Sequence, residues 1–207
     1  MKKWFLLTTS FFLLSAATVQ AADLKRGEYL FQACTACHGS KAQGNKVYGA
    51  PQLAGQKAWY LSLQLKKFQQ GIRGAHHEDV SGLKMRPMSR YLRSDEDIEN
   101  VSEYMATLSP RLPAQTLQGG NAVNGKVAYG TCAACHGMDA KGTDTLKAPD
   151  LTHLNDWYIL TQIQNYKTKI RGAHPRDAEG AQMAPMAMSL ANEQMIKDVI
   201  AYIESLR

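Results

Sequence analysis

The chain has 207 residues, of which 44% are hydrophobic, so it can form one large domain or two small ones. Its formal charge of +6 falls to +4 when Lys2 and Lys3, which lie in a predicted leader, are set aside. A modest positive charge without clusters of Lys or Arg argues against nucleic-acid binding. The composition also excludes a disordered or collagen-like chain.

The first 21 residues are predicted to be a secretory signal peptide. A basic start precedes an apolar stretch from Trp4 to Leu14, and small residues follow. Val19 and Ala21 stand where a signal peptidase requires them, which predicts cleavage after Ala21. The alternative is an uncleaved membrane anchor, but the apolar stretch is shorter than the ~20 residues of a bilayer span. We therefore expect an exported, periplasmic protein.

The rest of the chain is a tandem repeat with an offset of 98 positions. The repeated motifs are QACTACHG (32–39) with GTCAACHG (130–137), APQL (50–53) with APDL (148–151), WY (59–60 and 157–158), IRGAH (72–76 and 170–174), and MRPM (85–88) with MAPM (183–186). Two long copies indicate two similar domains, because a solenoid needs more and shorter units. We expect a first domain at residues 22–109, a Pro- and Gly-containing linker at 110–124, and a second domain at 125–207.

Each domain is predicted to be all-α, with three or four helices. A short helix leads into each cysteine pair, and a longer one covers Lys57–Gln70, with its counterpart at Asn155–Lys169. Apolar residues at helical spacing predict final helices at Ser94–Leu108 and Asn192–Leu206, in which Ser94 and Asn192 are the N-caps. About 85 residues make a thin core, so we expect another group to fill each interior.

A Cys-x-x-Cys-His motif opens each repeat. Its residues are Cys34, Cys37 and His38 in the first domain, and Cys132, Cys135 and His136 in the second. This motif attaches c-type haem, because two thiols three positions apart reach two vinyl groups of one porphyrin and the next residue can ligate the iron. Four cysteines in an exported protein otherwise suggest disulfides. A thioredoxin-like dithiol would need a βαβ context, and a four-cysteine zinc site would leave both histidines unexplained. The sequence therefore predicts two covalently bound haem c groups.

Methionine and histidine are the candidates for the ligand on the other side of each iron. Each domain offers two repeated methionines, which are Met85 and Met88 in the first and Met183 and Met186 in the second. A methionine on a helical face usually fills a core. These four are instead expected in loops before the last helix, beside a proline, which makes them candidate ligands.

A histidine and a tryptophan also recur in each domain outside the Cys-x-x-Cys-His motif. His76 and His174 are rival ligands, but they lie in polar, glycine-flanked segments, and we expect a role at the surface or near the haem propionates. Trp59 and Trp157 each begin a helix, and we expect them to pack against haem with the indole N–H reaching a propionate. A plain core role explains both tryptophans equally well.

Taken together, these motifs resemble those of the dihaem class I cytochromes c of the cytochrome c4 family. The resemblance covers nearly the whole mature chain and implies two tandem class I domains, each wrapped around one haem. It implies that Met85 and Met183 are the axial ligands, with the methionines three positions later as alternatives, because IRGAHHEDVSGLK and its counterpart depart from the family pattern. It also implies that the carbonyls of Pro51 and Pro149 accept a hydrogen bond from the axial histidines.

An iron held by methionine and histidine has no open position, which favours electron transfer over catalysis. The resemblance implies a monomeric periplasmic carrier that takes electrons from a quinol-oxidising complex or a dehydrogenase and passes them to a terminal oxidase or reductase. It is compatible with peripheral association with the membrane. The alternatives are an electron-accepting subunit of a sulfur- or alcohol-oxidising dehydrogenase, a dihaem peroxidase and a gas sensor. The peroxidase is disfavoured because both repeats are alike around their candidate ligands.

Overall fold

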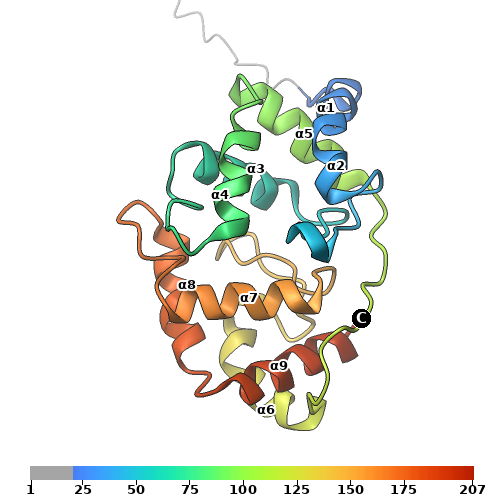
Figure 1. The fold of residues 1–207 in the computed structure, drawn as a ribbon. Coiled ribbons are helices and arrows are strands. Elements are labelled where there is room, and N and C mark those ends of the chain that lie inside the picture. Colours follow the sequence, from blue (N-terminus) through green and yellow to red (C-terminus); the bar gives the residue numbers. More distant parts are fainter. Residues whose placement is uncertain (1–20) are drawn as a thin grey trace, which may run out of the picture.

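The computed structural model describes residues 21–207, so the predicted signal peptide lies outside it except for Ala21. The described chain forms two helical domains, one above the other in Figure 1. The first contains α1 (Leu24–Phe31), α2 (Thr35–His38), α3 (Ala58–Gln69), α4 (Val80–Ser89) and α5 (Asp95–Thr107). The second contains α6 (Ala122–His136), α7 (Asp156–Lys167), α8 (Ala178–Met188) and α9 (Glu193–Ser205). Short 3₁₀ turns lie at Gln32–Cys34 and Lys46–Tyr48, and isolated bridges join Asn45 to Ala50 and Thr143 to Ala148. The all-α prediction is confirmed.

In each domain the first helix packs across the last one, α1 on α5 and α6 on α9. A glycine allows the close approach: a Cβ on Gly27 would lie 2.2 Å from the carbonyl oxygen of Asn100, and one on Gly125 would lie 1.9 Å from that of Asp198. Side chains of the same two partners also fix the chain before each first helix. Asn100 Oδ1 and Asp198 Oδ1 each accept a backbone N–H, from Asp23 and Asn121 respectively, at 2.8 Å. The repeat therefore preserves the helix crossing in detail.

The final helices begin where the sequence predicts. The Ser94 hydroxyl accepts a hydrogen bond from Asp97 N at 3.0 Å, and Asn192 Oδ1 accepts one from Met195 N at 2.9 Å. Such capping satisfies backbone donors that the first helical turn leaves unpaired. Both predicted N-caps are confirmed.

The prediction that the repeated methionines lie in loops is wrong. They lie on α4 and α8, which contain Pro87 and Pro185. Each helix starts at a capping aspartate: Asp79 Oδ1 accepts from Gly82 N at 3.0 Å, and Asp177 Oδ1 accepts from Gly180 N at 3.1 Å. The sequence prediction of a loop rests on the proline. The capping aspartates nevertheless start a helix in each domain, and the proline lies near the end of that helix.

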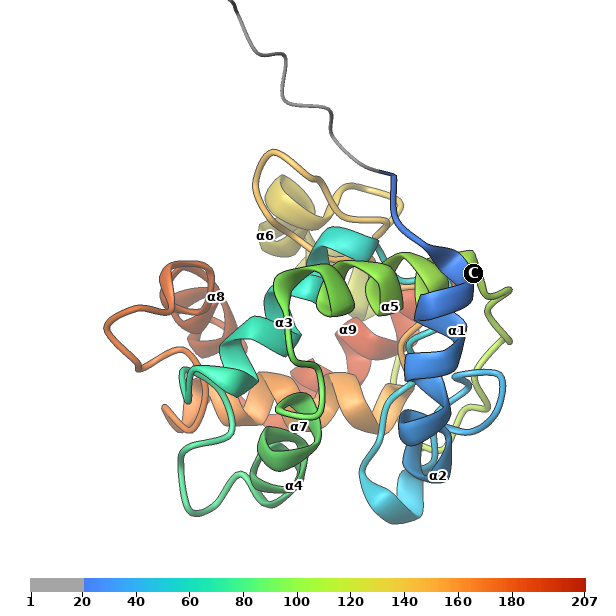
Figure 2. The same cartoon turned by 90° about the horizontal axis from the view of Figure 1, so that it is seen from above.

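The linker runs along the right-hand side of Figure 1 and is held by the second domain. Asp156 accepts hydrogen bonds from the backbone N–H groups of Thr116 and Leu117 and from the Thr116 hydroxyl, the last at 2.9 Å. Helix α6 begins at Ala122, so it extends into the predicted linker. Figure 2 looks down onto the first domain, with α6 and α8 extending beyond it. Within residues 21–207, no helix combines the length and apolar character that crossing a membrane requires.

Candidate functional site

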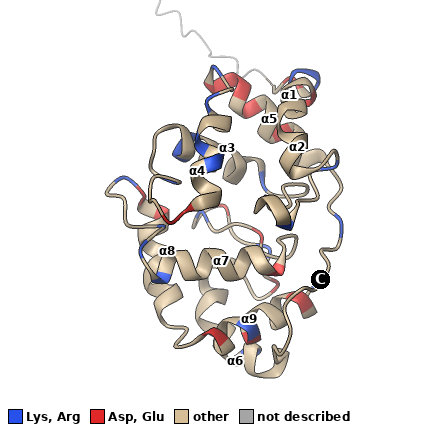
Figure 3. Cartoon of the chain, viewed as in Figure 1, with Lys and Arg blue, Asp and Glu red and all other residues tan. Residues whose placement is uncertain are grey.

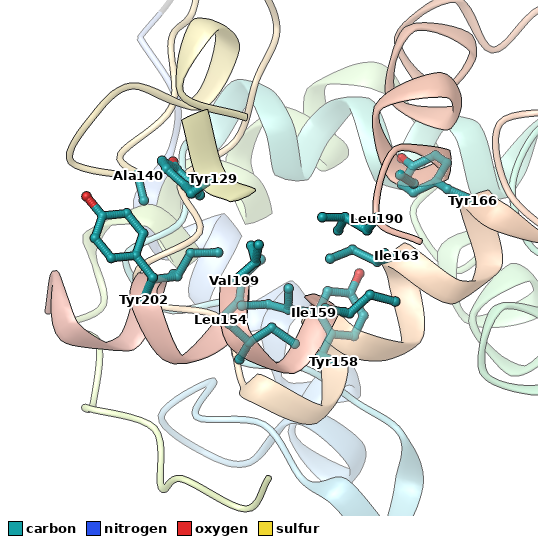
Figure 4. Packing of buried hydrophobic residues seen from close by; sticks show 14 residues of the cluster. Tyr129, Ala140, Leu154, Tyr158, Ile159, Ile163, Tyr166, Leu190, Val199 and Tyr202 are labelled. Carbon is teal, nitrogen blue, oxygen red and sulfur yellow. The ribbon is translucent and has the colours of Figure 1, made fainter. Parts of the chain in front are cut away.

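A cavity lies in each domain, and the predicted site residues line it. The first cavity is lined by Cys34, Cys37, His38, Met85 and Met88 among others, and the second by Cys132, Cys135, His136, Met183 and Met186. Most of the remaining wall is apolar. In Figure 4, Tyr129 and Val199 lie on one side of the second cavity, and Ile163 and Leu190 lie on the other. The fold thus brings together cysteine, histidine and methionine side chains that are far apart in the sequence.

The two histidines are oriented by backbone carbonyls. His38 Nδ1 donates to the carbonyl oxygen of Pro51 at 2.8 Å, and His136 Nδ1 donates to that of Pro149 at 3.0 Å. This confirms the predicted hydrogen bonds. Burial lowers the pKa of both imidazoles, although these carbonyls act in the opposite direction. Each ring is therefore neutral at pH 7. Since Nδ1 carries the proton, Nε2 is unprotonated, and this is the form that ligates a metal.

The first thiol of each pair has a raised pKa, unlike the reactive thiol of a redox-active dithiol. All four cysteines are free in the structure. Burial, with a smaller contribution from Cys37, raises the pKa of Cys34 to about 11, and burial likewise raises the pKa of Cys132. Reactive Cys-x-x-Cys pairs instead have lowered pKa values, because the thiolate is the nucleophile. The buried thiols of Cys34 and Cys132 therefore do not favour a redox-active dithiol.

The first methionine of each pair packs against the apolar core of its domain. Met85 and Met183 are both half-buried and contact these cores. Met88, by contrast, is 46% exposed, whereas Met186 is half-buried like Met183. The rival ligands are elsewhere: neither His76 nor His174 lines a cavity, and the Nδ1 of each accepts a backbone N–H two residues later in its own loop.

The two cavities share a wall between the domains. Tyr60 and Gln64 from α3, together with Tyr158 and Gln162 from α7, line both cavities. These residues are related by the 98-position repeat, so the wall is built by equivalent faces of the two domains. This arrangement places the two sites next to each other.

Two buried arginines complete this wall by reaching across the domain boundary. Arg73 donates to Tyr158 Oη at 2.8 Å, and Arg171 donates to Tyr60 Oη at 3.2 Å. Each guanidinium also donates to Gln64 Oε1 and to Gln162 Oε1, at 2.8–3.1 Å. Burial acts to raise the pKa of Tyr60, but the nearby arginines lower it overall. Sequence reasoning missed these arginines, although the repeated IRGAH motif contains both.

The expected packing of the tryptophans against haem is wrong, whereas the alternative core role is confirmed for Trp157. Neither Trp59 nor Trp157 lines a cavity, and the tyrosine that follows each one does so instead. Trp59 Nε1 donates to Asp144 Oδ1 of the second domain at 2.9 Å, and the Lys147 ammonium lies 5.1 Å from the centre of the Trp59 ring. Trp157 packs against the core of its own domain. The first tryptophan therefore contributes to the domain interface.

Comparison with known protein families decides what these cavities hold. The family model described as Cytochrome c matches residues 24–109 and again residues 122–207. The chain belongs to the cytochrome c family. It is a dihaem cytochrome of the cytochrome c4 type, with one covalently bound haem in each domain.

Individual relatives differ in how much of their length this cytochrome matches. It is 26% identical over 214 residues to cytochrome c-552 of Acidithiobacillus ferridurans, an alignment that covers 98% of this chain and 87% of that one. It is 33% identical over 127 residues to the Cbb3-type cytochrome c oxidase subunit CcoP of Rubrivivax gelatinosus, covering 61% of this chain but only 38% of the subunit. The crystal structure of reduced recombinant cytochrome c4 from Pseudomonas stutzeri is similar with a TM-score of 0.71 and 25% identity, covering 90% of this chain and 100% of that one.

The shared wall of the cytochrome fits the chemistry of haem. Arg73 and Arg171 are both buried, yet within residues 21–207 neither forms an ion pair with a carboxylate. In addition, Arg73 Nε has no hydrogen-bond partner there. Buried charges are normally paired. Haem carries two propionate carboxylates, and these would supply a negative partner for the two guanidinium groups when haem is bound.

Proposed function

We propose that this dihaem cytochrome c is a periplasmic electron carrier that takes electrons from a quinol-oxidising complex or a dehydrogenase and passes them to a terminal oxidase or reductase. The observation that supports this most strongly is the repetition of a closed ligand set. Each cavity offers a neutral histidine and a half-buried methionine, and both cavities do so in the same way. A peroxidase would need one iron with both axial positions filled and one iron with an open position, and hence two different sites.

In this proposal the cysteines of each motif hold the haem, and the following histidine and a methionine ligate its iron. The ligands are His38 and Met85 in the first domain, and His136 and Met183 in the second. When bound, haem iron accepts and releases a single electron. The Pro51 and Pro149 carbonyls fix the histidine rings, which keeps the ligand orientation the same in both oxidation states. Little rearrangement then opposes electron transfer.

The shared wall supports exchange of electrons between the two sites. Tyr60, Gln64, Tyr158 and Gln162 contact both cavities, so only one layer of side chains separates them. Arg73 and Arg171 place two buried positive charges in that layer. A layer fixed by hydrogen bonds reorganises little when the charge on either side changes.

The carrier function is tested by measuring electron transfer from this protein to a terminal oxidase. The purified, reduced holoprotein is mixed with membranes that contain a haem–copper oxidase but lack other cytochrome c, and oxygen consumption is recorded. We expect oxygen uptake that depends on this protein, and oxidation of both haems. Absence of oxygen uptake, together with turnover of hydrogen peroxide, would contradict a carrier and support a peroxidase.

A second candidate is a cytochrome component of a larger redox enzyme. The match to CcoP supports it, since 61% of this chain aligns with 38% of that longer oxidase subunit. Haem-stained native gels of extracts from the source organism distinguish the two. A carrier migrates at the mass of the free chain, whereas an enzyme component migrates with its complex.

A further inference from the structure

The repeat is broken in the domain interface at the position of Lys67. Lys67, on α3 of the first domain, is buried with a side chain only 7% exposed. Its ammonium group donates to Asp177 Oδ1 and, at 2.6 Å, to Glu179 Oε2, both in the second domain. The Asp177 side chain is 3% exposed, so this is a buried ion pair that joins the two domains. Figure 3 colours the basic residues of α3 and the acidic residues at the start of α8.

The equivalent positions, 98 residues away in each direction, cannot form this contact. Lys67 corresponds to Asn165, Asp177 corresponds to Asp79, and Glu179 corresponds to Ser81. Asp79 is buried and caps α4 in the same way that Asp177 caps α8. In the described part of the chain, however, no ion pair joins Asp79 to the second domain. Of the two methionine-bearing helices, α4 and α8, only α8 is therefore tied to the opposite domain by a salt bridge at its start within the described residues.

The contact lies at the N-terminus of α8, the helix that carries Met183 along the second cavity. Lys67 and Glu179 both line that cavity, and Lys67 does not line the first. Asp177 precedes Met183 by six positions, and its carboxylate also accepts the Gly180 N–H that starts the helix. Lys67 thus holds the first turn of α8, and through that turn the position of Met183.

We propose that Lys67 is a positioning residue of the first domain that keeps Met183 of the second domain in place as an iron ligand. The proposal rests on the proposed function in one respect, which is the assignment of Met183 as that ligand. It makes the two sites unequal: the methionine helix of the second site depends on contact between the domains, whereas that of the first does not. Separation or rotation of the domains would therefore loosen the second ligand only.

The first experiment measures the helix directly. Hydrogen–deuterium exchange is followed by mass spectrometry on the holoprotein and on Lys67→Met. We expect amides of residues 178–183 to exchange at least about tenfold faster in the variant, because removing one partner of a buried pair strongly destabilises the local structure. Amides of residues 80–85 should be unchanged. The matched control is Asn165→Met, at the equivalent position of the second domain, which should leave both segments unchanged.

The second experiment reads the ligand. In Lys67→Met we expect the charge-transfer band of the methionine–iron bond to lose up to half its intensity, the share of one haem, on mild warming that leaves the wild-type band intact. Lys67→Arg should restore the band, which a loss of packing volume alone would not explain. Glu179→Gln keeps the Asp177 pair and is expected to fold normally, with a smaller increase in exchange of about two- to threefold.

Three results would overturn the proposal. One is equal exchange of the amides of residues 178–183 in the wild type, in Lys67→Met and in Glu179→Gln. Another is a Lys67→Met effect that falls on both haems alike, and the third is the same effect in Asn165→Met. If the wild-type protein lacks the methionine band altogether, the ligand assignment fails. The exchange data then still decide whether Lys67 holds α8.

Discussion

Replacing Gly125 with alanine tests the helix crossing that builds the second domain. The new Cβ would lie 1.9 Å from the Asp198 carbonyl oxygen and 2.4 Å from its carbonyl carbon, where ordinary contact begins at 3.4 Å. The obstacle is the backbone of α9 and not the end of a flexible side chain. Helix α9 must therefore move by about 1.5 Å relative to α6 to admit the methyl group.

Two opposing effects set the size of the change. Alanine is a better helix former than glycine in a helix interior by about 1 kcal/mol. Overpacking a tight contact costs about 1–3 kcal/mol, and a backbone obstacle places this site at the upper end of that range. We expect Gly125→Ala to lower the free energy of unfolding by about 2 kcal/mol. A Cβ added to Gly130 on the same helix would meet no heavy atom within 4 Å, so Gly130→Ala should raise it by about 1 kcal/mol.

Guanidinium unfolding of the holoprotein, followed by far-ultraviolet circular dichroism, gives both values. The two substitutions are chemically identical and lie in one helix, so a difference of about 3 kcal/mol between them isolates the crossing contact. Gly27→Ala in the first domain should behave like Gly125→Ala, because its Cβ would meet the Asn100 carbonyl oxygen at 2.2 Å. Equal stabilisation by Gly125→Ala and Gly130→Ala would refute the packing argument.

Three further substitutions probe the sites and the linker. Met183→Ala should make one haem high-spin and leave the other unchanged in its absorption spectrum, while an unaltered spectrum would move the assignment to Met186. Arg171→Leu removes a buried positive charge and should lower the reduction potential of the second haem more than that of the first; an unchanged potential in a redox titration would place the guanidinium away from the haem. Burial opposes ionisation of Asp156, but its hydrogen bonds to the linker lower its pKa overall. The ionised carboxylate therefore stabilises the fold above the unfolded pKa of about 4, and this stabilisation is lost as the pH falls through the folded pKa. Asp156→Asn should consequently lose less stability than the wild type between about pH 5 and pH 2. An identical dependence of stability on pH in the two proteins would contradict this.

Local patterns predict the parts of this fold that local interactions determine. The spacing of apolar residues and the capping side chains of Ser94 and Asn192 locate the final helices, because both signals lie within a few residues of the helix they specify. The doubled motif likewise places His38 and His136 beside a cavity in each domain. The helices that carry the methionines are not recognised, since Pro87 and Pro185 obscure the effect of the capping aspartates.

The domain interface depends on how two folded units dock, which a single sequence does not reveal. Arg73 and Arg171 recur in the repeat, but their tyrosine partners lie in the opposite domain, 85 and 111 positions away. The same holds for Lys67, which is ordinary as one basic residue on a helix and becomes significant only beside Asp177. The departure of position 165 from lysine is visible in the sequence, and its meaning becomes visible only in the structure.

A spectroscopic redox titration of the purified, exported holoprotein tests the central claim most directly. It counts the haems per chain, reports the spin state and methionine ligation of each iron, and gives both potentials. We predict two low-spin haems per chain, both with the methionine charge-transfer band and neither able to bind carbon monoxide readily. A colourless protein, or one whose irons both bind carbon monoxide, would contradict a carrier built on two closed haem sites.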